Sequence, residues 1–185
     1  MNKSKDHYLF NKKYSELKEE IEAITVPQDQ ALIAITYAAY ARVGEIVRGR
    51  YKANPPITAH QIEFTDTHMI IAILTEKTHQ WRKVPVSKKK EQWLVDIIQN
   101  YLEKYDQYEL FPYSTRWAEL RFKKWFGTER IHLLRHWATT HTLQGHRTVE
   151  PLMPQEVARL GGWVDFNSFY KTYSHYIIDD FIHKI

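Results

Sequence analysis

The chain has 185 residues, of which 43% are hydrophobic and 26% charged, a balance typical of globular proteins and not of disordered ones. The absence of cysteine excludes disulfides, thiolate metal sites and thiol nucleophiles, and it fits an intracellular protein. The net charge of +4 favours nucleic acid only weakly. No apolar run approaches the roughly 20 residues that span a bilayer, so we expect no contact with a membrane.

The predicted elements begin with two helices. Apolar residues at helical spacing predict a helix over about 12–24, and Pro27 fits the first turn of a second helix that continues to about Ile46. A glycine and paired prolines mark a loop at 49–56. Three short segments rich in β-branched and aromatic residues follow, and they predict a small three-stranded antiparallel sheet over 61–66, 68–78 and 81–86.

The remainder is predicted to be helical. Ser87 is a candidate N-cap for a helix that continues to about Tyr105. Further helices are expected at about 114–126, 130–143, 154–161 and 166–174, with a short apolar helix at about 177–184. We therefore expect a mainly α fold with a small three-stranded antiparallel β-sheet. No linker composition divides the chain, and we expect a single domain over 1–185.

Basic residues gather in three segments along the chain. Such a cluster is usually a solvated face, but several of them on one domain would form a phosphate-binding surface if they converge. The residues that we expect to contact DNA from these segments are Arg48, Arg50, Lys88, Arg121 and Lys123.

The segment RIHLLRHW, at 130–137, could carry chemistry. On a helix His132 and Arg135 project from one face, one turn apart. An imidazole that exchanges a proton beside a permanent cation suits a reacting phosphate. The simpler interpretation is that His132 and Arg135 lie on the surface, or lie in the core with their hydrogen bonds made within the protein. A metal site at His132, His136 and His141 is a third, although this stretch holds no carboxylate partner.

Two more candidates precede this segment. Arg42 follows an apolar helix, where a guanidinium needs a partner, and Glu45 could form a local ion pair with it. Lys77 lies at a predicted β-turn, where a lysine is ordinarily just solvated.

The last candidates lie near the C-terminus. Gly161 and Gly162 predict a helix end, and Trp163 follows at once. A tyrosine-rich helix comes next, with tyrosines at 170, 173 and 176 that could equally be core packing.

In order and spacing these segments resemble the catalytic domain of the tyrosine recombinases, the phage-integrase family, from about Arg42 to Tyr176. Arg42 and Glu45 match the family's first motif. Lys77 lies eight residues before Pro85 of a Val-Pro strand ending, as the family's hairpin lysine does. The HxxRH motif is matched by His132, Arg135 and His136.

Two further blocks complete the resemblance. Trp163 matches the form of the third block that carries Gly-Gly-Trp, and the phrase KTYSH places the nucleophile at Tyr173. The ten residues from Trp163 to Tyr173, where nine are expected, leave Tyr170 and Tyr176 as alternatives.

The resemblance implies a site-specific DNA recombinase, or integrase, that cleaves and rejoins DNA through a 3′-phosphotyrosyl intermediate without metal or cofactor. Arg42, Arg135 and Trp163 would hold the phosphate, and Tyr173 would attack it. His132 would take or steer the phenol proton and Lys77 would protonate the leaving 5′ hydroxyl, with Glu45 and His136 in support. A type IB topoisomerase and a non-catalytic DNA-binding relative are the alternatives.

The resemblance also implies partners. The chain would bind double-stranded DNA and self-associate on it as a tetrameric synapse, with the C-terminal helix 177–185 as a candidate contact. Viral genome integration is one expected role, with excision and dimer resolution as alternatives, and the expected location is intracellular, in the cytoplasm or in a host cell. The helical DNA-clamping domain that normally precedes this catalytic domain is expected to be absent from the chain.

Overall fold

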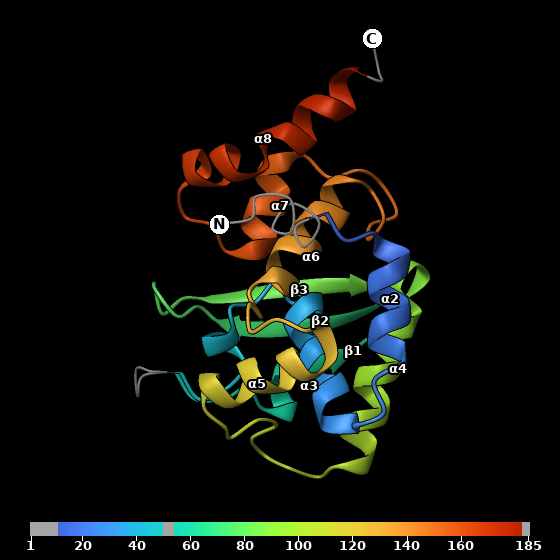
Figure 1. Cartoon of the computed structure of the whole chain (residues 1–185), viewed down its shortest axis with the longest axis vertical. Helices are drawn as coiled ribbons and strands as arrows, with labels where there is room; N and C mark the ends of the chain where they lie inside the picture. The colour runs from blue at the N-terminus through green and yellow to red at the C-terminus, as the bar shows by residue number, and fades with distance from the viewer. Residues whose placement is uncertain (1–10, 50–53, 183–185) are drawn as a thin grey trace.

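The computed structural model describes residues 11–49 and 54–182, and their side chains as far as Ser174. These residues form seven α-helices and one three-stranded sheet (Figure 1), so the predicted mainly α fold with a small sheet is confirmed. No helix in the described part of the chain is long and apolar enough to span a membrane.

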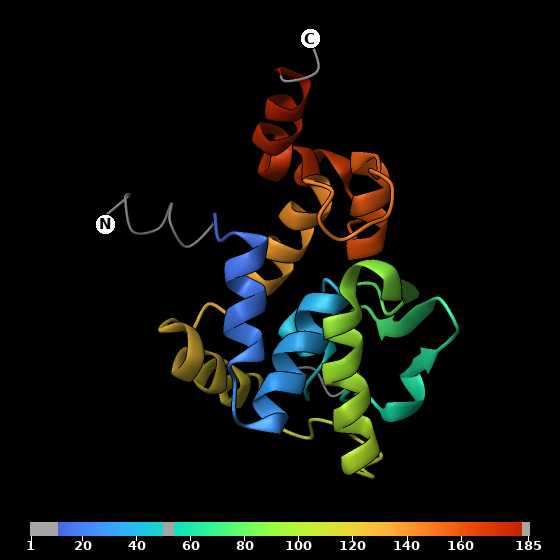
Figure 2. The ribbon, with the colours of Figure 1, turned by 90° about the vertical axis from the view of Figure 1, so that its right-hand side faces the viewer.

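A helix that is buried beyond its first turn, α3 (Pro27–Ala38), organises the first part of the fold. It begins at Pro27 as predicted, and all eight residues of 31–38 are buried. A helix that is apolar on every side needs cover on every side. The helices that contact α3 are α2 (Tyr14–Glu22), α4 (Lys88–Lys104), α5 (Thr115–Phe126) and α6 (Leu133–Leu143). Figure 2 shows α2, α3 and α4 side by side.

The end of α3 differs from the prediction, which placed it near Ile46. Tyr40 has a φ of 51°, which a continuing right-handed helix does not allow. Its hydroxyl forms a 2.6 Å hydrogen bond with the hydroxyl of Thr142, and this distant contact holds the turn. A short 3-10 helix, η1 (Val43–Glu45), follows, with Arg42 in extended geometry just before it.

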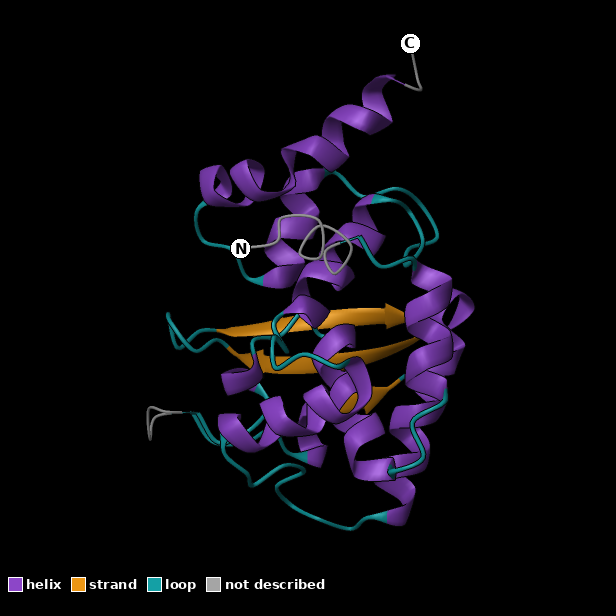
Figure 3. Cartoon of the chain, in the orientation of Figure 1, coloured by secondary structure: helices purple, strands orange, loops and turns teal. Residues whose placement is uncertain are grey.

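The predicted antiparallel sheet is present in the order β1-β2-β3. Its strands are β1 (Ile62–Phe64), β2 (His68–Leu74) and β3 (Trp81–Ser87). Met69, Ile71 and Val84 share the face that packs on the core, whereas Trp81 and Lys83 face solvent. Figure 3 shows the strands in orange with the β2–β3 turn reaching out past the helices.

The C-terminal part adds α6 and two further helices, α7 (Pro154–Gly161) and α8 (Phe166–Ile182). Val157 and Ala158 of α7 form a small separate apolar cluster with Phe169 and Tyr173 of α8. The prediction of two helices, at 166–174 and 177–184, was wrong, because α8 is continuous through Ile182. No glycine or proline between 166 and 182 interrupts it.

Candidate functional site

Arg42 is held at the point where α3 ends. Its backbone N–H donates to Oε2 of Glu45 at 2.9 Å, and its Nη1 donates to Oε1 of the same carboxylate at 3.1 Å. The Glu45 carboxylate thus caps the first turn of η1 and also holds the guanidinium of Arg42 in place. The Arg42 side chain remains 29% exposed, so part of its donor capacity faces outward.

Glu45 joins this arginine to two other segments. Its side chain is fully buried, and it accepts from Nη2 of Arg82 and from the backbone N–H of Glu76, each at 3.3 Å. The carboxylate of Glu76 lies close to Gly44, since a Cβ there would lie 2.7 Å from Oε1 of Glu76. Glu45 therefore links Arg42, Arg82 and the backbone of Glu76.

Arg82 was not among the predicted site residues. Its Nη1 donates to the carbonyls of Ala39 at 2.8 Å and Leu160 at 2.6 Å, and it thereby ties the end of α3 to α7. Burial lowers the pKa of Arg82, and Glu45 opposes part of that effect. One signal could have found it: alternation places this cation on the same face of β3 as the buried Val84.

Lys77 is exposed at the β2–β3 turn, where the sequence placed it. The turn is firmly held. Thr75 pairs its hydroxyl with that of Thr78 at 2.6 Å and accepts from the backbone of Gln80 at 3.0 Å. Nδ1 of His79 pairs with the side chain of Asn54 at 3.1 Å. Lys77 is thus presented by an ordered tip whose neighbour, Glu76, is bonded to Glu45.

Arg135 lies in the first turn of α6 and is buried. Its Nη1 donates to the carbonyl of Tyr40 at 2.9 Å, and this bond holds Arg135 against the turn that follows α3. Its Nη2 is also buried but has no hydrogen-bond partner among the described residues. Burial, and then the nearby charge of Arg42, lower the pKa of Arg135 to about 9, so the group remains cationic at neutral pH.

Trp163 stacks on this guanidinium. The centroid of its ring lies 3.7 Å from Cζ of Arg135, a close cation–π contact. The ring packs directly against Gly161, where a Cβ would lie 1.8 Å from Cζ3 of the indole. Gly162 ends α7 at a φ of 74°, which favours glycine and turns the chain so that Trp163 faces α6.

Tyr173 completes the cluster from α8. Its ring stacks on His136 at 5.1 Å between centroids and meets Trp163 edge-on at 5.8 Å. It is 3% exposed, and its phenol lies near enough to Arg135 to act on the pKa of that arginine. By contrast, Tyr170 is 45% exposed, and the side chain of Tyr176 lies outside the described ones.

A short connection, Val164 and Asp165, joins Trp163 to α8. Asp165 begins that helix, because its two carboxylate oxygens accept from the backbone of Asn167 at 2.9 Å and of Ser168 at 3.2 Å. With α8 fixed in this register, Tyr173 faces α6 and Tyr170 faces away.

The two histidines differ in position. His132 is the N-cap of α6 and not part of it, since the helix begins at Leu133 and not at 130 as predicted. Its side chain is exposed, yet partial burial and the charge of Arg130 lower its pKa, so it is neutral at pH 7. His136 is the imidazole in ring contact with Tyr173.

The fold therefore brings Arg42, Arg135, Trp163 and Tyr173 together. Glu45 bonds to Arg42 and to the backbone of Glu76, the residue before Lys77. Arg42 acts electrostatically on Arg135, and Glu45 offsets part of that repulsion. Two guanidinium groups so close, one with a buried donor left over, favour an anion between them.

The residues expected to contact DNA elsewhere are mostly engaged within the protein. The partners are Glu109 for Arg48, the carbonyl of Thr65 for Lys88, Asp29 for Arg121 and Glu129 for Lys123. Arg121 grips the buried Asp29 through two 2.6 Å bonds, which makes it a structural brace. Arg50 lies outside the described residues.

No group of three metal-ligating side chains occurs among the residues for which positions are given. His141, weighed above as a metal ligand, uses both ring nitrogens. Nδ1 pairs with the hydroxyl of Tyr37 at 2.9 Å, and Nε2 pairs with the carbonyl of Lys12 at 2.7 Å. This histidine is part of the core.

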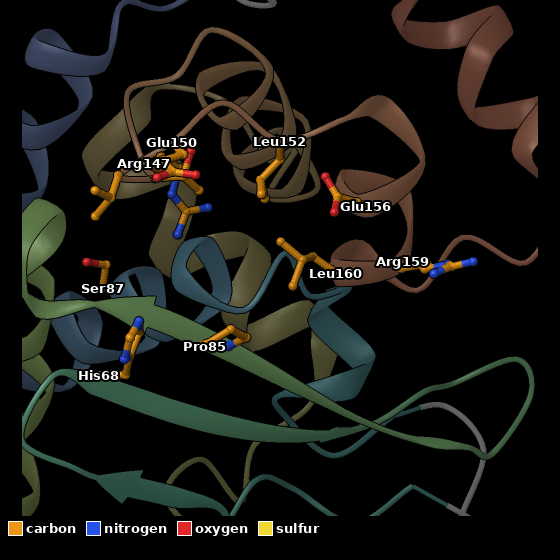
Figure 4. A pocket seen from close by; sticks show the side chains of 11 residues that line it. His68, Pro85, Ser87, Arg147, Glu150, Leu152, Glu156, Arg159 and Leu160 are labelled. Atoms are coloured by element: carbon orange, nitrogen blue, oxygen red, sulfur yellow. The ribbon is translucent and has the colours of Figure 1, made fainter.

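A cavity of about 540 Å³ lies between β3 and α7 (Figure 4). Its walls include His68, Pro85, Ser87, Arg147, Leu152 and Leu160, and none of the candidate catalytic residues. Figure 4 shows these side chains around the gap between the strand and the helix. The cavity is therefore separate from the cluster at Arg135, which is covered by Trp163.

No protein-family model and no curated protein matches the sequence. Solved structures do match. A XerH site-specific recombinase bound to palindromic difH substrate, in a post-cleavage complex, has a TM-score of 0.59 at 16% identity over 87% of this chain. The pre-cleavage complex of XerH with difH substrate has a TM-score of 0.56 at 16% identity over 84%.

The chain spans about half the length of these recombinases, since the match covers 47% of each. The likeness confirms that the chain has the fold of the tyrosine recombinase catalytic domain, as the sequence motifs predicted.

Proposed function

We propose that the chain is the catalytic part of a site-specific DNA recombinase that cleaves and rejoins DNA through a phosphotyrosyl intermediate. One observation carries the proposal: within this recombinase fold, Arg135 keeps a buried guanidinium donor without an acceptor, next to Arg42 and Tyr173. Two fixed cations beside a phenol suit a phosphodiester, whose non-bridging oxygens gather charge in the transition state.

In the proposed reaction the phenol oxygen of Tyr173 attacks phosphorus and forms a 3′-phosphotyrosyl bond, while the bond from phosphorus to the 5′ oxygen breaks. The phenol proton passes to His132, which is neutral at pH 7 because its pKa is lowered. Lys77 donates a proton to the leaving 5′ oxygen.

The remaining residues position these groups. Arg42 and Arg135 hold the phosphate oxygens, and Trp163 packs against Arg135. Glu45 keeps Arg42 and the lysine-bearing turn together. Religation reverses each step, and the energy of the broken bond is kept in the tyrosyl ester.

Assembly belongs to the same proposal and rests on the family resemblance. The recombinase would pair DNA sites as a tetramer, with segment 177–185 as a contact between copies. Residues 177–182 continue α8, although their side chains and residues 183–185 lie outside what the structure describes. The similar XerH structures are complexes with their difH substrates, which supports DNA as the substrate of this chain.

The test is covalent trapping. The wild-type chain is incubated with a library of nicked duplexes of random sequence, so that the unknown target site is sampled, and covalent adducts are isolated under denaturing conditions. We expect a protein–DNA adduct whose modified peptide contains Tyr173, and we expect Tyr173→Phe to abolish it while DNA binding persists.

Tyr170→Phe is the matched control, because it removes an exposed tyrosine from the preceding turn of the same helix. It should retain the adduct. An adduct that survives Tyr173→Phe but is lost in Tyr170→Phe or Tyr176→Phe would show that the nucleophile is misassigned. DNA binding by the wild-type chain without any adduct would identify a non-catalytic relative instead.

A further inference from the structure

The outer face of the β2–β3 hairpin carries an exposed indole beside a lysine. Trp81 is 62% exposed, although tryptophan is usually largely buried. Lys83 lies two residues on, so both side chains project from the same face of β3. The side chain of Lys83 is exposed and makes no ion pair or hydrogen bond with any residue in the described ranges.

The hairpin is oriented by the residue between these two. Arg82 points inward, to Glu45 and the candidate catalytic cluster. Trp81 and Lys83 therefore point outward, away from that cluster. In Figure 2 the sheet forms the right-hand margin of the molecule, and no helix lies beyond it. The hairpin thus has one side facing the catalytic residues and one side facing solvent.

The hairpin is also well ordered where Trp81 begins β3. Trp81 pairs with Leu74 across the strands, immediately before the bonded turn from Thr75 to Gln80. The side chain of Asn54 donates to the carbonyl of Leu74 at 3.2 Å and braces the same point. A side chain on an ordered element loses little conformational entropy when it binds.

An exposed aromatic next to free cations favours nucleic acid. The flat indole can pack on bases and sugars, while the ammonium group pairs with a phosphate. Lys77 at the tip adds a second exposed cation to the hairpin. Most of the other expected DNA contacts are engaged with carboxylates of the protein, as described above, which leaves this hairpin as a cationic element that is free to bind.

We infer that the β2–β3 hairpin enters a groove of duplex DNA, with its catalytic face towards the cleaved strand and Trp81 and Lys83 towards the other strand. Lys83 then binds a phosphate of that strand, and Trp81 packs against its sugars and bases. A two-stranded hairpin is narrow enough to enter a groove of DNA and to touch it on both faces. The inference rests on the proposed function, because the inward face must lie at the scissile phosphate.

The test measures equilibrium binding of the full chain to a fluorescent duplex of mixed sequence, by anisotropy, over a series of salt concentrations. Trp81→Ala should weaken binding by about 10-fold at every salt concentration, because it removes a stacking contact that carries no charge. Lys83→Ala should weaken binding and reduce the slope of log affinity against log salt by about 1, since it removes one phosphate contact. Trp81→Phe should recover most of the affinity.

Tyr108→Ala and Lys104→Ala are matched controls, because they remove an exposed aromatic and an exposed lysine far from the hairpin turn. Both should bind as the wild type does. Unchanged affinity in Trp81→Ala, with adduct formation through Tyr173 intact, would overturn this inference and leave the proposed function standing. A wild-type chain that binds no DNA would overturn both.

Discussion

A single buried guanidinium shows how the candidate site is built. Arg135 gives one nitrogen to the carbonyl of Tyr40 and keeps the other without an acceptor in the described part of the chain. A donor that is removed from water without a partner costs roughly 1–3 kcal/mol. The ring of Trp163, stacked on this guanidinium, offsets part of that cost through a cation–π attraction of about 0.5–2 kcal/mol.

Replacing Gly161 with alanine should disturb this stack. The new Cβ would lie 1.8 Å from Cζ3 of Trp163, so the indole must leave the face of Arg135. We expect Gly161→Ala to lower the free energy of unfolding by about 1–3 kcal/mol, the usual cost of overpacking. Urea denaturation followed by circular dichroism measures this change.

The same substitution in a Trp163→Ala background provides the control. With the indole removed, the added methyl group meets no ring, so Gly161→Ala should then cost little, and the two changes should be strongly non-additive. Equal costs in both backgrounds would mean that contact with the ring is not what requires glycine here.

Among the elements, the connection between α6 and α7 depends on one buried ion pair. Arg147 donates from Nε and Nη2 to the two oxygens of Glu91, each at 2.9 Å. Glu91 lies at a kink in α4, with a φ of −128°. Burial alone would lower the pKa of Arg147, but Glu91 and the rings of Tyr40 and Tyr37 outweigh it and raise the pKa. This pair thereby anchors the segment that leads to α7 and Trp163.

Glu91→Gln should leave a buried cation without its counter-charge, because both side chains are at most 2% exposed. We expect a loss of about 3–5 kcal/mol in the free energy of unfolding, measured by urea denaturation. The same change at the exposed Glu129, which pairs with Arg116 and Lys123, should cost far less, because solvent screens exposed ion pairs. Similar small costs at both positions would show that the Arg147 pair adds little to stability.

How far these elements could be predicted depends on how local their causes are. The sheet and most helices follow from hydrophobic periodicity and turn residues. The motif spacing predicted one site formed by Arg42, Lys77, His132, Arg135, Trp163 and Tyr173, and the described contacts join four of these, namely Arg42, Arg135, Trp163 and Tyr173. The end of α3 could not be predicted, because the turn at Tyr40 rests on a hydroxyl contact 102 residues away.

The same reason explains the basic residues. Arg121 looked like a phosphate contact, but its partner Asp29 lies 92 residues earlier in the chain. Arg82 was missed because its three acceptors come from separate elements, although its place on the buried face of β3 was a usable signal. Contacts between distant segments leave little trace in local sequence.

At the scale of the whole molecule, one buried histidine couples the fold to pH. His141 is fully buried between Tyr37 and the carbonyl of Lys12. Burial lowers its pKa from 6.5 to about 4. Between pH 6.5 and about pH 4, His141 is therefore protonated in the unfolded chain but neutral in the folded chain.

Stability from this group is therefore fully present above pH 6.5 and is lost as the pH falls towards about 4. The expected loss is at most about 3 kcal/mol. Urea denaturation at pH 7 and pH 4.5 measures it, with His141→Gln as the comparison. The stability advantage of the wild type over His141→Gln should shrink on acidification, whereas the exposed His60→Gln should follow the wild type at both pH values. An advantage that does not change with pH would contradict this assignment.

The covered position of Arg135 has one more consequence. Because solvent does not reach its second nitrogen, no anion can arrive there until some neighbouring group shifts aside. In the proposed recombinase, DNA binding and strand cleavage would then be successive events, and binding could be reversed before cleavage begins. Such a recombinase would bind many stretches of duplex DNA and release them uncut, and it would cleave only where binding displaces the groups that cover Arg135.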